Sequence, residues 1–326
     1  MGATGAVGQE MIQILAERKF PVASISFLAS ERSAGKNIGF KGKSYQVSVL
    51  SDRSFDNVDI VLASAGGSLS RQYAPLAVEK GAVVIDNTSA FRMDPEVPLV
   101  IPEINAGEIR KQKGIIANPN CSTIIMLMPL FPLDQANPIR RVTVATYQAA
   151  SGAGARAMEE LKTQAGDVLA GRPVVKSAFP HQIAFNVFSH NSSVAANGYN
   201  EEENKMIKET HKILGRKTIK VAVTCVRVPV LRAHTEAMYV EFARPMTPER
   251  VRKILSKAPG VRVVDDPQKN YFPMPIEAAG KDDVLVGRIR QDLFSAKTVG
   301  LLASGDQLRK GAALNAIQIA ERLCGL

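Results

Sequence analysis

The chain has 326 residues, which is enough for two domains of ordinary size with a large core. Its hydrophobic content of 45% and charged content of 22% are typical of a soluble globular protein. The three cysteines are too few and too widely spaced for a disulfide framework or a zinc cluster, which indicates a reducing compartment. No apolar run approaches the roughly 20 residues that cross a bilayer, and no secretory signal is visible, so we expect no membrane partner.

The net charge of +10 is compatible with nucleic acid and with small anions as partners. The 41 Lys and Arg residues are spread along the chain, without a block of about five or six consecutive basic residues. Only 6 Tyr and 12 Phe, and no Trp, are available to stack on bases. We therefore expect no nucleic-acid partner and interpret the charge as a field that steers anionic substrates.

The chain opens on a glycine-rich turn, Gly2 to Gly8, followed by a predicted helix over 9–20. Met11, Ile12 and Leu15 are spaced to line one face of that helix. The glycines at positions 2, 5 and 8 suit a tight turn whose backbone amides reach a pyrophosphate at the helix N-terminus. Such a turn is often only a loop, so its surroundings decide the interpretation.

A predicted strand over 25–29 ends in a polar segment, 30–35, at about the distance from the glycines where dinucleotide folds meet the adenosine ribose. Arg32 lies there between two serines and suits a 2′-phosphate, which favours NADP. Glu31 is the dissenting residue, because an acid at this place can bind the free ribose hydroxyl of NAD. We expect NADP, with NAD and an incidental polar loop as the alternatives.

Further strands are predicted over 58–64 and 83–86, separated by a helix over 69–80. This alternation predicts a doubly wound parallel sheet, with Ser64 to Gly67 at the carboxyl edge where ligands bind. The glycine turn should follow a central strand, yet only Met1 precedes it. Because the loss of a central strand exposes ladder groups on its neighbours, we expect the native protein to carry a further strand before Met1. Intact mass and N-terminal sequencing of native protein test this.

Cys121 lies between a short apolar run, 115–117, and a second apolar run that begins after the cysteine. The cluster Asn118-Pro119-Asn120 breaks the first run, which places the thiol at a strand-to-helix turn. The free N–H groups and positive dipole end of a helix favour the thiolate, which is the nucleophilic form. Cys121 is therefore a candidate nucleophile for a carbonyl, and a small buried hydrophobe is the alternative.

A predicted strand over 142–148 ends at Gln148, ahead of a glycine-containing turn and a helix over 155–169. Gln148 can hydrogen-bond a substrate carbonyl or help to position the nucleophile. Ser151 and Gly152 let the backbone approach a flat ring or an anion closely. An ordinary turn with a glycine break is the alternative.

Two further segments carry candidate polar residues. Glu202 and Lys205 share one face of a helix predicted through 214, where such pairs are normally solvated surface charges. Arg227 lies near the end of a strand predicted over 219–229, and His234 lies between that strand and another over 237–242, where a loop side chain can face a site. The ordinary pKa of histidine suits proton transfer, so His234 beside Cys121 would be a general base.

Arg92 follows the strand predicted over 83–86. Its guanidinium can grip a carboxylate or a phosphate in two places, as can that of Arg227, although either can equally be a surface arginine. The three Cys and four His show no close ligand spacing, so we expect no metal site.

Together these segments resemble aspartate-semialdehyde dehydrogenases nearly end to end. The resemblance is carried by the segments Gly2–Gly8, Ser64–Gly67, Asn87–Arg92, Asn118–Thr123, Tyr147–Gly154, Gly198–Lys205, Arg227–His234 and Gly305–Ala312. It implies NADPH-dependent conversion of aspartyl-4-phosphate to aspartate-4-semialdehyde with release of phosphate, at the branch toward lysine, threonine, methionine and isoleucine.

The resemblance also implies a role for each matched residue. Cys121 resembles the nucleophile that forms an acyl-thioester, His234 the acid/base that handles the thiol and thiohemiacetal protons, and Gln148 the residue that orients substrate and thiol. The matched substrate-binding residues are Arg92 and Lys205 for phosphate with Asn120 nearby, Arg227 for the α-carboxylate and Glu202 for the amino group. The matched cofactor-binding residues are Thr4, Gly5, Ala6, Val7, Arg32, Ser33, Ser151, Gly152 and Gln307.

The implied fold is α/β, with a Rossmann-type doubly wound NADP-binding domain and an α+β catalytic and dimerisation domain built on a large mixed sheet. We expect the first domain over 1–122, completed by a C-terminal helical segment over 305–326, and the second over 123–304. Strand-like stretches over 261–264, 284–290 and 299–303 are consistent with the large sheet. The resemblance implies a homodimer or a dimer of dimers, in bacterial cytoplasm or plastid stroma.

Two alternatives share this sequence pattern. An N-acetyl-glutamyl-phosphate reductase would use the same thiol, histidine and NADP chemistry. It would need no carboxylate partner for nitrogen, whereas Glu202 with Arg227 suits a free amino acid. A non-catalytic relative of the same fold could lose the thiol or the base, whereas this chain retains Cys121, Gln148 and His234 together.

Overall fold

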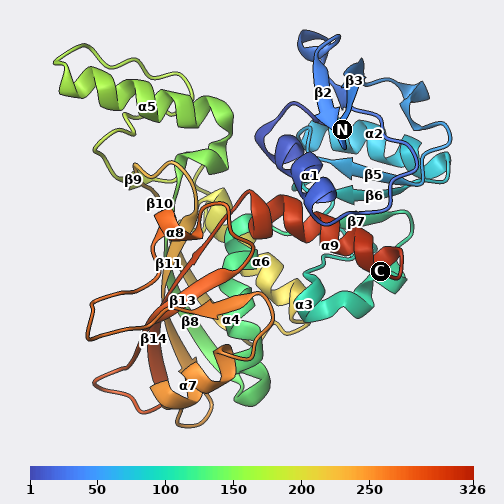
Figure 1. The fold of residues 1–326 in the computed structure, drawn as a ribbon. Helices are drawn as coiled ribbons and strands as arrows, with labels where there is room; N and C mark the ends of the chain where they lie inside the picture. The colour runs from blue at the N-terminus through green and yellow to red at the C-terminus, as the bar shows by residue number, and fades with distance from the viewer. The chain divides into compact units, whose positions relative to one another are not determined.

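The computed structural model describes residues 1–326 and divides the chain into two compact units. The N-terminal unit comprises Met1–Asn120 together with Ala312–Leu326, and the central unit comprises Cys121–Gly311. Figure 1 shows the helices and strands of both units in the colours of the chain.

The N-terminal unit is built on a three-stranded parallel sheet in the order β5-β6-β7. Its strands are β5 (Ile60–Ala63), β6 (Val83–Asp86) and β7 (Ile115–Ala117). Its helices are α1 (Ala6–Glu17), α2 (Gly67–Glu79), the short α3 (Pro102–Asn105) and α9 (Leu314–Leu323). Two small sheets complete it: β1 (Leu28–Ala29) with β4 (Ser48–Val49), and the hairpin of β2 (Asn37–Phe40) and β3 (Lys43–Gln46).

The last helix of the chain is part of the core of the N-terminal unit. Ile14 and Leu15 of α1 pack in one apolar cluster with Leu314 and Ile317 of α9, and all four side chains are buried. Ile116 of β7 belongs to the same cluster. The core of this unit therefore joins residues from both ends of the chain.

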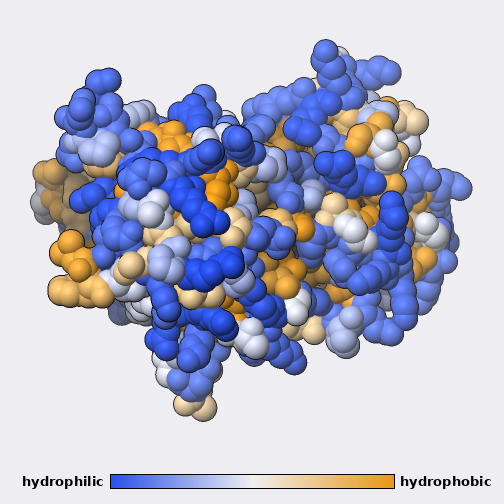
Figure 2. All heavy atoms as spheres, turned by 90° about the horizontal axis from the view of Figure 1, so that it is seen from below, coloured by the Kyte–Doolittle hydropathy of each residue, from blue (hydrophilic) through white to orange (hydrophobic).

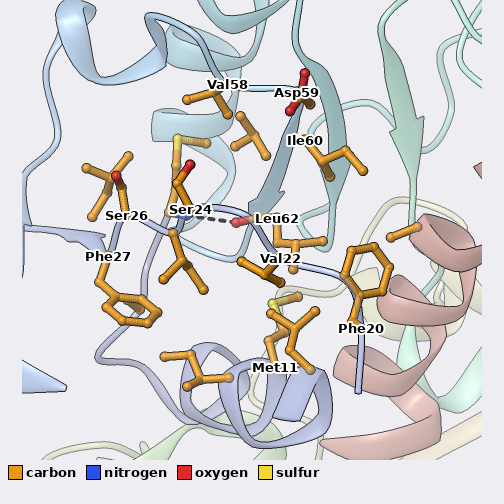
Figure 3. A pocket seen from close by; sticks show the side chains of 18 of the residues that line it. Met11, Phe20, Val22, Ser24, Ser26, Phe27, Val58, Asp59, Ile60 and Leu62 are labelled. Atoms are coloured by element: carbon orange, nitrogen blue, oxygen red, sulfur yellow. Dashed lines mark hydrogen bonds between the residues drawn. The ribbon is translucent and has the colours of Figure 1, made fainter. Parts of the chain in front are cut away.

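A pocket of about 420 Å³ lies in the N-terminal unit between the segment 20–28 and strand β5. Figure 3 shows the apolar side chains of Met11, Val22 and Leu62 gathered around it. The N-terminal ammonium of Met1 donates to Leu62 O at 2.7 Å, and Ser64 N–H donates to Met1 O at 3.0 Å, so Met1 is hydrogen-bonded alongside β5. On the opposite wall, the backbone N–H groups of the next two residues donate to Leu28 O.

The central unit is built on a seven-stranded sheet in the order β12-β13-β14-β11-β8-β10-β9. The pairs β8–β10 and β12–β13 are parallel and the other pairs are antiparallel, so the sheet is mixed. The strands are β8 (Ile139–Gln148), β9 (Phe188–Ser189), β10 (Lys220–Arg227), β11 (His234–Phe242), β12 (Val261–Val263), β13 (Val284–Gln291) and β14 (Thr298–Gly305).

Three helices pack on this sheet: α4 (Cys121–Ala136), α6 (Glu201–Ile213) and α7 (Pro248–Leu255). Helix α4 is buried along most of its length and is apolar around its whole circumference, as expected of a helix inside a core. Helix α5 (Ala155–Leu169) lies away from the sheet in Figure 1, and α8 (Pro275–Ala278) is a single turn.

The other face of the sheet carries no packed helix in Figure 1. Along β8 and β11 the side chains alternate between buried and exposed, and Thr143, Tyr147, Tyr239 and Glu241 lie on the exposed side. Figure 2 shows the surface of the whole chain from below. Hydrophilic residues cover most of this view, and hydrophobic residues form separate patches. The central unit thus has one covered and one open sheet face.

The α/β class with a Rossmann-type domain and a large mixed sheet is confirmed. One predicted position is wrong: His234 is not in a loop between strands but is the first residue of β11, with its side chain fully buried. The sequence pattern does not place His234 in a strand, because its neighbours Ala233 and Thr235 give no alternating apolar signal. The β2–β3 hairpin and helix α7 were not predicted.

Candidate active site

The ends of four neighbouring strands meet at one edge of the central sheet. Gln148 ends β8, Arg227 ends β10, and the register pairs these two residues directly. Antiparallel to them, His234 begins β11 and is paired with Gly305, the last residue of β14. Strand pairing therefore gathers an amide, a guanidinium and an imidazole that are up to 86 positions apart in sequence (148 to 234).

Cys121 is the first residue of α4 and is partly exposed. The first N–H groups of a helix lack partners in the helix, and together with the dipole they stabilise negative charge on a thiolate there. A Cβ built on Gly311 would lie 2.9 Å from the Cys121 Cβ, so only glycine fits beside the thiol. Gly311 lies in a π-helical turn, Arg309–Ala313, that follows β14. A turn of this kind is often found at functional sites.

His234 presents one ring nitrogen to the site. Its Nδ1 accepts a hydrogen bond from the backbone N–H of Ala149 at 3.1 Å, whereas its Nε2 has no protein partner. Burial, reinforced by Arg227 and His190, holds the pKa of the His234 ring well below its ordinary value. The ring is therefore neutral, and with Nδ1 accepting, its proton is on Nε2. Ala233, directly before it, has a φ of 74°, a strained conformation for a residue with a side chain.

Gln148 connects the helix of the thiol with the helix of the acidic candidates. Its Nε2 donates to Ser122 Oγ at 3.0 Å and lies 3.4 Å from Glu202 Oε1. Ser122 follows Cys121 in α4, and Glu202 is in the first turn of α6. The amide is almost completely buried, so its position is fixed by these contacts.

Arg227 is buried and is held only by neutral acceptors. Its Nη1 donates to Ala149 O at 2.8 Å, and its Nη2 donates to His190 Nε2 at 2.7 Å and to Asn191 Oδ1 at 3.1 Å. The guanidinium also lies over the Phe179 ring, 5.7 Å from its centroid. Burial lowers the pKa of Arg227 from its ordinary value, against the opposing effects of Glu202 and Cys121. A buried cation without a hydrogen-bonded carboxylate suits an anionic ligand.

Glu202 and Lys205 differ from an ordinary solvated pair. Lys205 Nζ lies 2.8 Å from Glu201 Oε1 and 3.8 Å from Glu202 Oε2. The Glu202 side chain is 8% exposed, whereas that of Lys205 is 26% exposed. The surface-pair alternative therefore fits the contact between Lys205 and Glu201, and Glu202 points inward toward Gln148.

Arg92 and Asn120 belong to the N-terminal unit. Both are buried, and Nη2 of Arg92 donates to Asn87 O at 2.8 Å. Asn120 directly precedes Cys121 in the chain. The structure thus brings together Cys121, Gln148, Glu202, Lys205, Arg227 and His234 in the central unit, and places the other two substrate candidates in the N-terminal unit.

Helix α1 begins at Ala6, within the glycine turn and three residues earlier than the sequence predicts. Gly2 has a φ of 80°, and a Cβ on Gly8 would lie 2.2 Å from Gly2 O, so both positions require glycine. Thr4 Oγ1 donates to Ser33 Oγ at 3.1 Å, which joins the turn to the segment that carries Arg32. The Gly5 N–H donates to Gly2 O at 3.0 Å, and the amides of Ala6 and Val7 at the start of α1 lie on the same side of this unit as the predicted ribose-binding residues.

The three remaining cofactor candidates lie beside His234 in the central unit. Gln307 donates from Nε2 to Ser151 Oγ, and its Oε1 accepts from Ala233 N–H at 2.8 Å. A Cβ on Gly152 would lie 3.0 Å from His234 Cε1 and 3.1 Å from Arg227 Nη1. Gly152 therefore leaves the imidazole and guanidinium in place where any side chain would push against them.

Sequence reasoning missed three residues that support the site: Ser122, His190 and Asp306. Asp306 is fully buried, accepts from Arg232 Nε at 2.7 Å, and accepts from the backbone N–H groups of Gly280 and Leu308, which fixes the turn that carries Gln307. His190 is one of only 4 histidines in the chain, and that scarcity was the available signal. No group of three or more His, Cys, Asp or Glu is arranged to hold a metal ion. None of the helices is both long and apolar enough to cross a membrane.

Comparison with known protein families gives two matches. Residues 1–112 match the NAD-binding domain of semialdehyde dehydrogenases, and residues 130–310 match their dimerisation domain. Among curated proteins, the aspartate-semialdehyde dehydrogenase of Synechocystis sp. is 55% identical over 323 residues, which cover 99% of this chain and 96% of the relative.

Solved structures agree. The crystal structure of aspartate semialdehyde dehydrogenase II from Vibrio cholerae complexed with ASA has a TM-score of 0.96 at 46% identity, covering 99% of this chain and 96% of that one. The aspartate semialdehyde dehydrogenase of Candida albicans with NADP has a TM-score of 0.75 at 26% identity, covering 99% and 97%. The chain belongs to the aspartate-semialdehyde dehydrogenase family and has that family's NAD-binding and dimerisation domains.

Proposed function

We propose that the chain is an NADP-dependent enzyme that converts aspartyl-4-phosphate to aspartate-4-semialdehyde and phosphate through a thioester on Cys121. The observation that carries this proposal is the placement of Cys121 at the N-terminus of α4, in the same unit as a buried His234 Nε2 without a protein partner and a buried Arg227 whose hydrogen bonds go to no carboxylate. The product would enter the branch toward lysine, threonine, methionine and isoleucine.

The thiol chemistry follows from the helix N-terminus. The Cys121 thiolate attacks the acyl carbon, the carbon–oxygen bond to phosphate breaks, and the electron pair leaves with phosphate. NADPH, when bound, supplies the hydride that reduces the thioester carbon. The thiohemiacetal oxyanion then collapses, releasing the aldehyde and the Cys121 thiolate. The amides at the start of α4 stabilise that thiolate before and after the cycle.

His234 acts first as a hydrogen-bond donor. Because Nδ1 accepts from Ala149 N–H, the neutral ring can only donate from Nε2, to the thiolate and to the oxyanion of the tetrahedral intermediates. A full acid/base role needs a second proton on the ring, which would displace the Ala149 N–H. We therefore propose that His234 acts mainly by donating a hydrogen bond from Nε2. Proton exchange, the acid/base role that the resemblance implies, is then a secondary step.

Substrate binding divides by charge. Arg227 would hold the α-carboxylate, because its buried guanidinium has no carboxylate partner in its own hydrogen bonds. Glu202 would receive the amino group, and Gln148 beside it would orient the reacting carbonyl. Arg92 and Lys205 would hold the phosphate, with Asn120 next to the thiol.

The cofactor fits the glycine turn. The amides of Ala6 and Val7 at the start of α1, together with Thr4, suit a pyrophosphate, and Gly8 lets the helix approach the turn closely. Arg32 and Ser33 suit the 2′-phosphate of NADP, whereas Glu31 suits the free ribose hydroxyl of NAD. A relative from Candida albicans was solved with NADP. Ser151, Gly152 and Gln307 would contact the reacting end of the cofactor beside His234.

We infer that the open face of the central sheet forms a homodimer interface. The exposed side chains Tyr147 and Tyr239 lie on this face, and aromatic residues are enriched at interfaces. The match to a dimerisation domain over 130–310 supports this. Light scattering of wild type and Tyr239→Glu tests it: the wild type should be a dimer or a dimer of dimers, and an unchanged mass for the variant would contradict this placement.

The decisive assay runs the reaction backward, with aspartate semialdehyde, phosphate and either NADP or NAD. We expect reduction of NADP by the wild type and loss of at least about 10³-fold in Cys121→Ala. Equal turnover in both proteins would end the nucleophile proposal. A parallel assay with N-acetyl-glutamate semialdehyde distinguishes the alternative, and faster turnover of the acylated substrate would identify the reductase instead.

A further inference from the structure

We propose that His190 is a positioning residue for substrate binding: it holds the Arg227 guanidinium as a neutral hydrogen-bond acceptor and leaves its positive charge available to the substrate carboxylate. The inference rests on the proposed function in one respect, the assignment of Arg227 to that carboxylate. It concerns how the chain fixes an arginine without neutralising it.

The contacts around Arg227 share one property, which is the absence of negative charge. Ala149 O, His190 Nε2 and Asn191 Oδ1 accept its three hydrogen bonds at 2.8, 2.7 and 3.1 Å. His190 makes the shortest of them. Arg227 is 2% exposed, so water does not reach it easily to compensate its charge. A carboxylate in any of these three places would satisfy the cation and would compete with an incoming substrate carboxylate.

The tautomer of His190 follows from the donors around it. An arginine N–H can only donate, so Nε2 must accept, and a neutral ring then carries its proton on Nδ1. Nδ1–H donates to Ser192 Oγ at 3.0 Å, and the same Oγ accepts from Glu202 N–H at 3.3 Å. The backbone N–H of Ser192 also points at Nδ1, at 3.2 Å; because a neutral ring has only one accepting nitrogen, this longer contact yields to the 2.7 Å hydrogen bond from Arg227. His190 thus links Arg227 to the first turn of α6.

His190 stays neutral because of where it lies. Burial, opposed by Glu202 and reinforced by Arg227 and Lys205, lowers the pKa of His190 to about 4. Glu201 also faces it and raises that pKa. The chain therefore uses an imidazole as a permanent acceptor across the working pH range. The same hydrogen-bond chain ties the carboxylate-binding candidate, Arg227, to the amine-binding candidate, Glu202.

A pair of variants with the same shape and different charge tests the proposal. His190→Gln offers a neutral acceptor of similar reach, and His190→Glu offers the same shape with a negative charge. We expect the KM for aspartate semialdehyde to change by less than about threefold in the Gln variant and to rise about tenfold or more in the Glu variant. The KM for phosphate should change little in either. His211→Gln on the outer part of α6 is the control histidine variant.

A second measurement does not depend on turnover. Nitrogen NMR of the His190 ring should show Nδ1 protonated and Nε2 unprotonated near neutral pH, and Arg227→Met should allow the ring to titrate closer to its ordinary value. Equal KM changes in the Gln and Glu variants would overturn the proposal, as would a proton on Nε2. If the ring has the expected tautomer but no variant or wild type turns over semialdehyde, the proposed function fails and the positioning of Arg227 stands.

Discussion

Two cysteines of the central unit have opposite surroundings. Cys121 begins α4, is partly exposed, and lies against Gly311. Cys225 lies within β10, is completely buried, and its Sγ contacts Met206 Sδ at 3.8 Å. Burial raises the pKa of the Cys225 thiol far above its ordinary value, outweighing a hydrogen bond with Thr146 that lowers it. The same side chain is thus a candidate nucleophile at a helix start and a packing residue within a strand.

The difference shows that position within an element decides the chemistry here. Within a strand, a thiol contacts only neighbouring side chains. At the start of a helix, N–H groups that have no carbonyl partner within the helix can stabilise a thiolate.

Alkylation should give the largest effect. In a Cys324→Ser background, which removes the exposed cysteine, iodoacetamide should label Cys121 alone and abolish at least about 99% of the activity. Cys225 should stay unlabelled until the protein is denatured, because its thiol is buried and protonated. Mass spectrometry of the labelled peptides checks this, and labelling of Cys225 in the folded protein would break the contrast.

Substitution of His234 should give the next largest effect. If the ring acts by donating from Nε2, His234→Asn keeps a donor and should lose about 10-fold to 100-fold in kcat, whereas His234→Ala should lose about 10²-fold to 10³-fold. Steady-state rates with saturating substrates measure both. Identical rates for the two variants would favour proton transfer over donation.

Arg227→Lys should have an effect of about tenfold. Lysine keeps the charge but cannot form the two-pronged contact with a carboxylate, so the KM for semialdehyde should rise about tenfold. The KM for phosphate should change little, because Arg92 and Lys205 are the proposed phosphate ligands. A rise of both constants together would place Arg227 elsewhere in the mechanism.

Substitutions around Cys225 should change stability and leave activity nearly unchanged. Cys225→Ala should lower the free energy of unfolding by about 1 kcal/mol and change kcat by less than about twofold. Cys225→Ser should cost more, because a buried hydroxyl loses more hydration than a thiol and needs stronger hydrogen-bond partners. Denaturant unfolding with parallel assays measures both. A large loss of activity in the Ala variant would contradict a packing role.

Substitution of Glu236, which is close to Cys225, should have the smallest effect on the free energy of unfolding, and this effect should depend on pH. Burial raises the pKa of Glu236 well above its ordinary value of 4.5, and neither carboxylate oxygen has a partner. The folded state therefore keeps a proton that the unfolded chain loses above about 4.5, so stability falls as pH rises from there. Glu236→Gln should remove this slope and raise the free energy of unfolding near neutral pH by about 1 kcal/mol. An unchanged slope would show that Glu236 is not its source.

Much of the fold was predictable because its apolar runs end at turn residues. Strands β6 and β7 and helix α5 have the bounds that the sequence predicts. The β2–β3 hairpin was missed because its strands are short and largely polar, and its signal was only the Lys41-Gly42 turn, where both residues have positive φ.

The residues of the candidate site stay a prediction, and their arrangement could not be predicted from the sequence. The pairing of Gln148 with Arg227, and of His234 with Gly305, depends on strand register across the sheet. No local pattern encodes this register. The contact between His190 and Arg227 joins residues 37 positions apart and likewise leaves no local trace. The Nδ1 hydrogen bond from Ala149, which sets the tautomer of His234, is of the same kind.

The core that joins α1 to α9 has a consequence for synthesis on the ribosome. The N-terminal unit cannot close its core until Leu314 and Ile317 have been translated, long after Asn120. At about 5–20 residues per second, the intervening chain takes roughly 10–40 s to appear. During that interval the apolar face of α1 has no final partner and is exposed to chaperones and proteases. A stop codon shortly before Leu314 should therefore leave the first unit as a ready substrate for degradation.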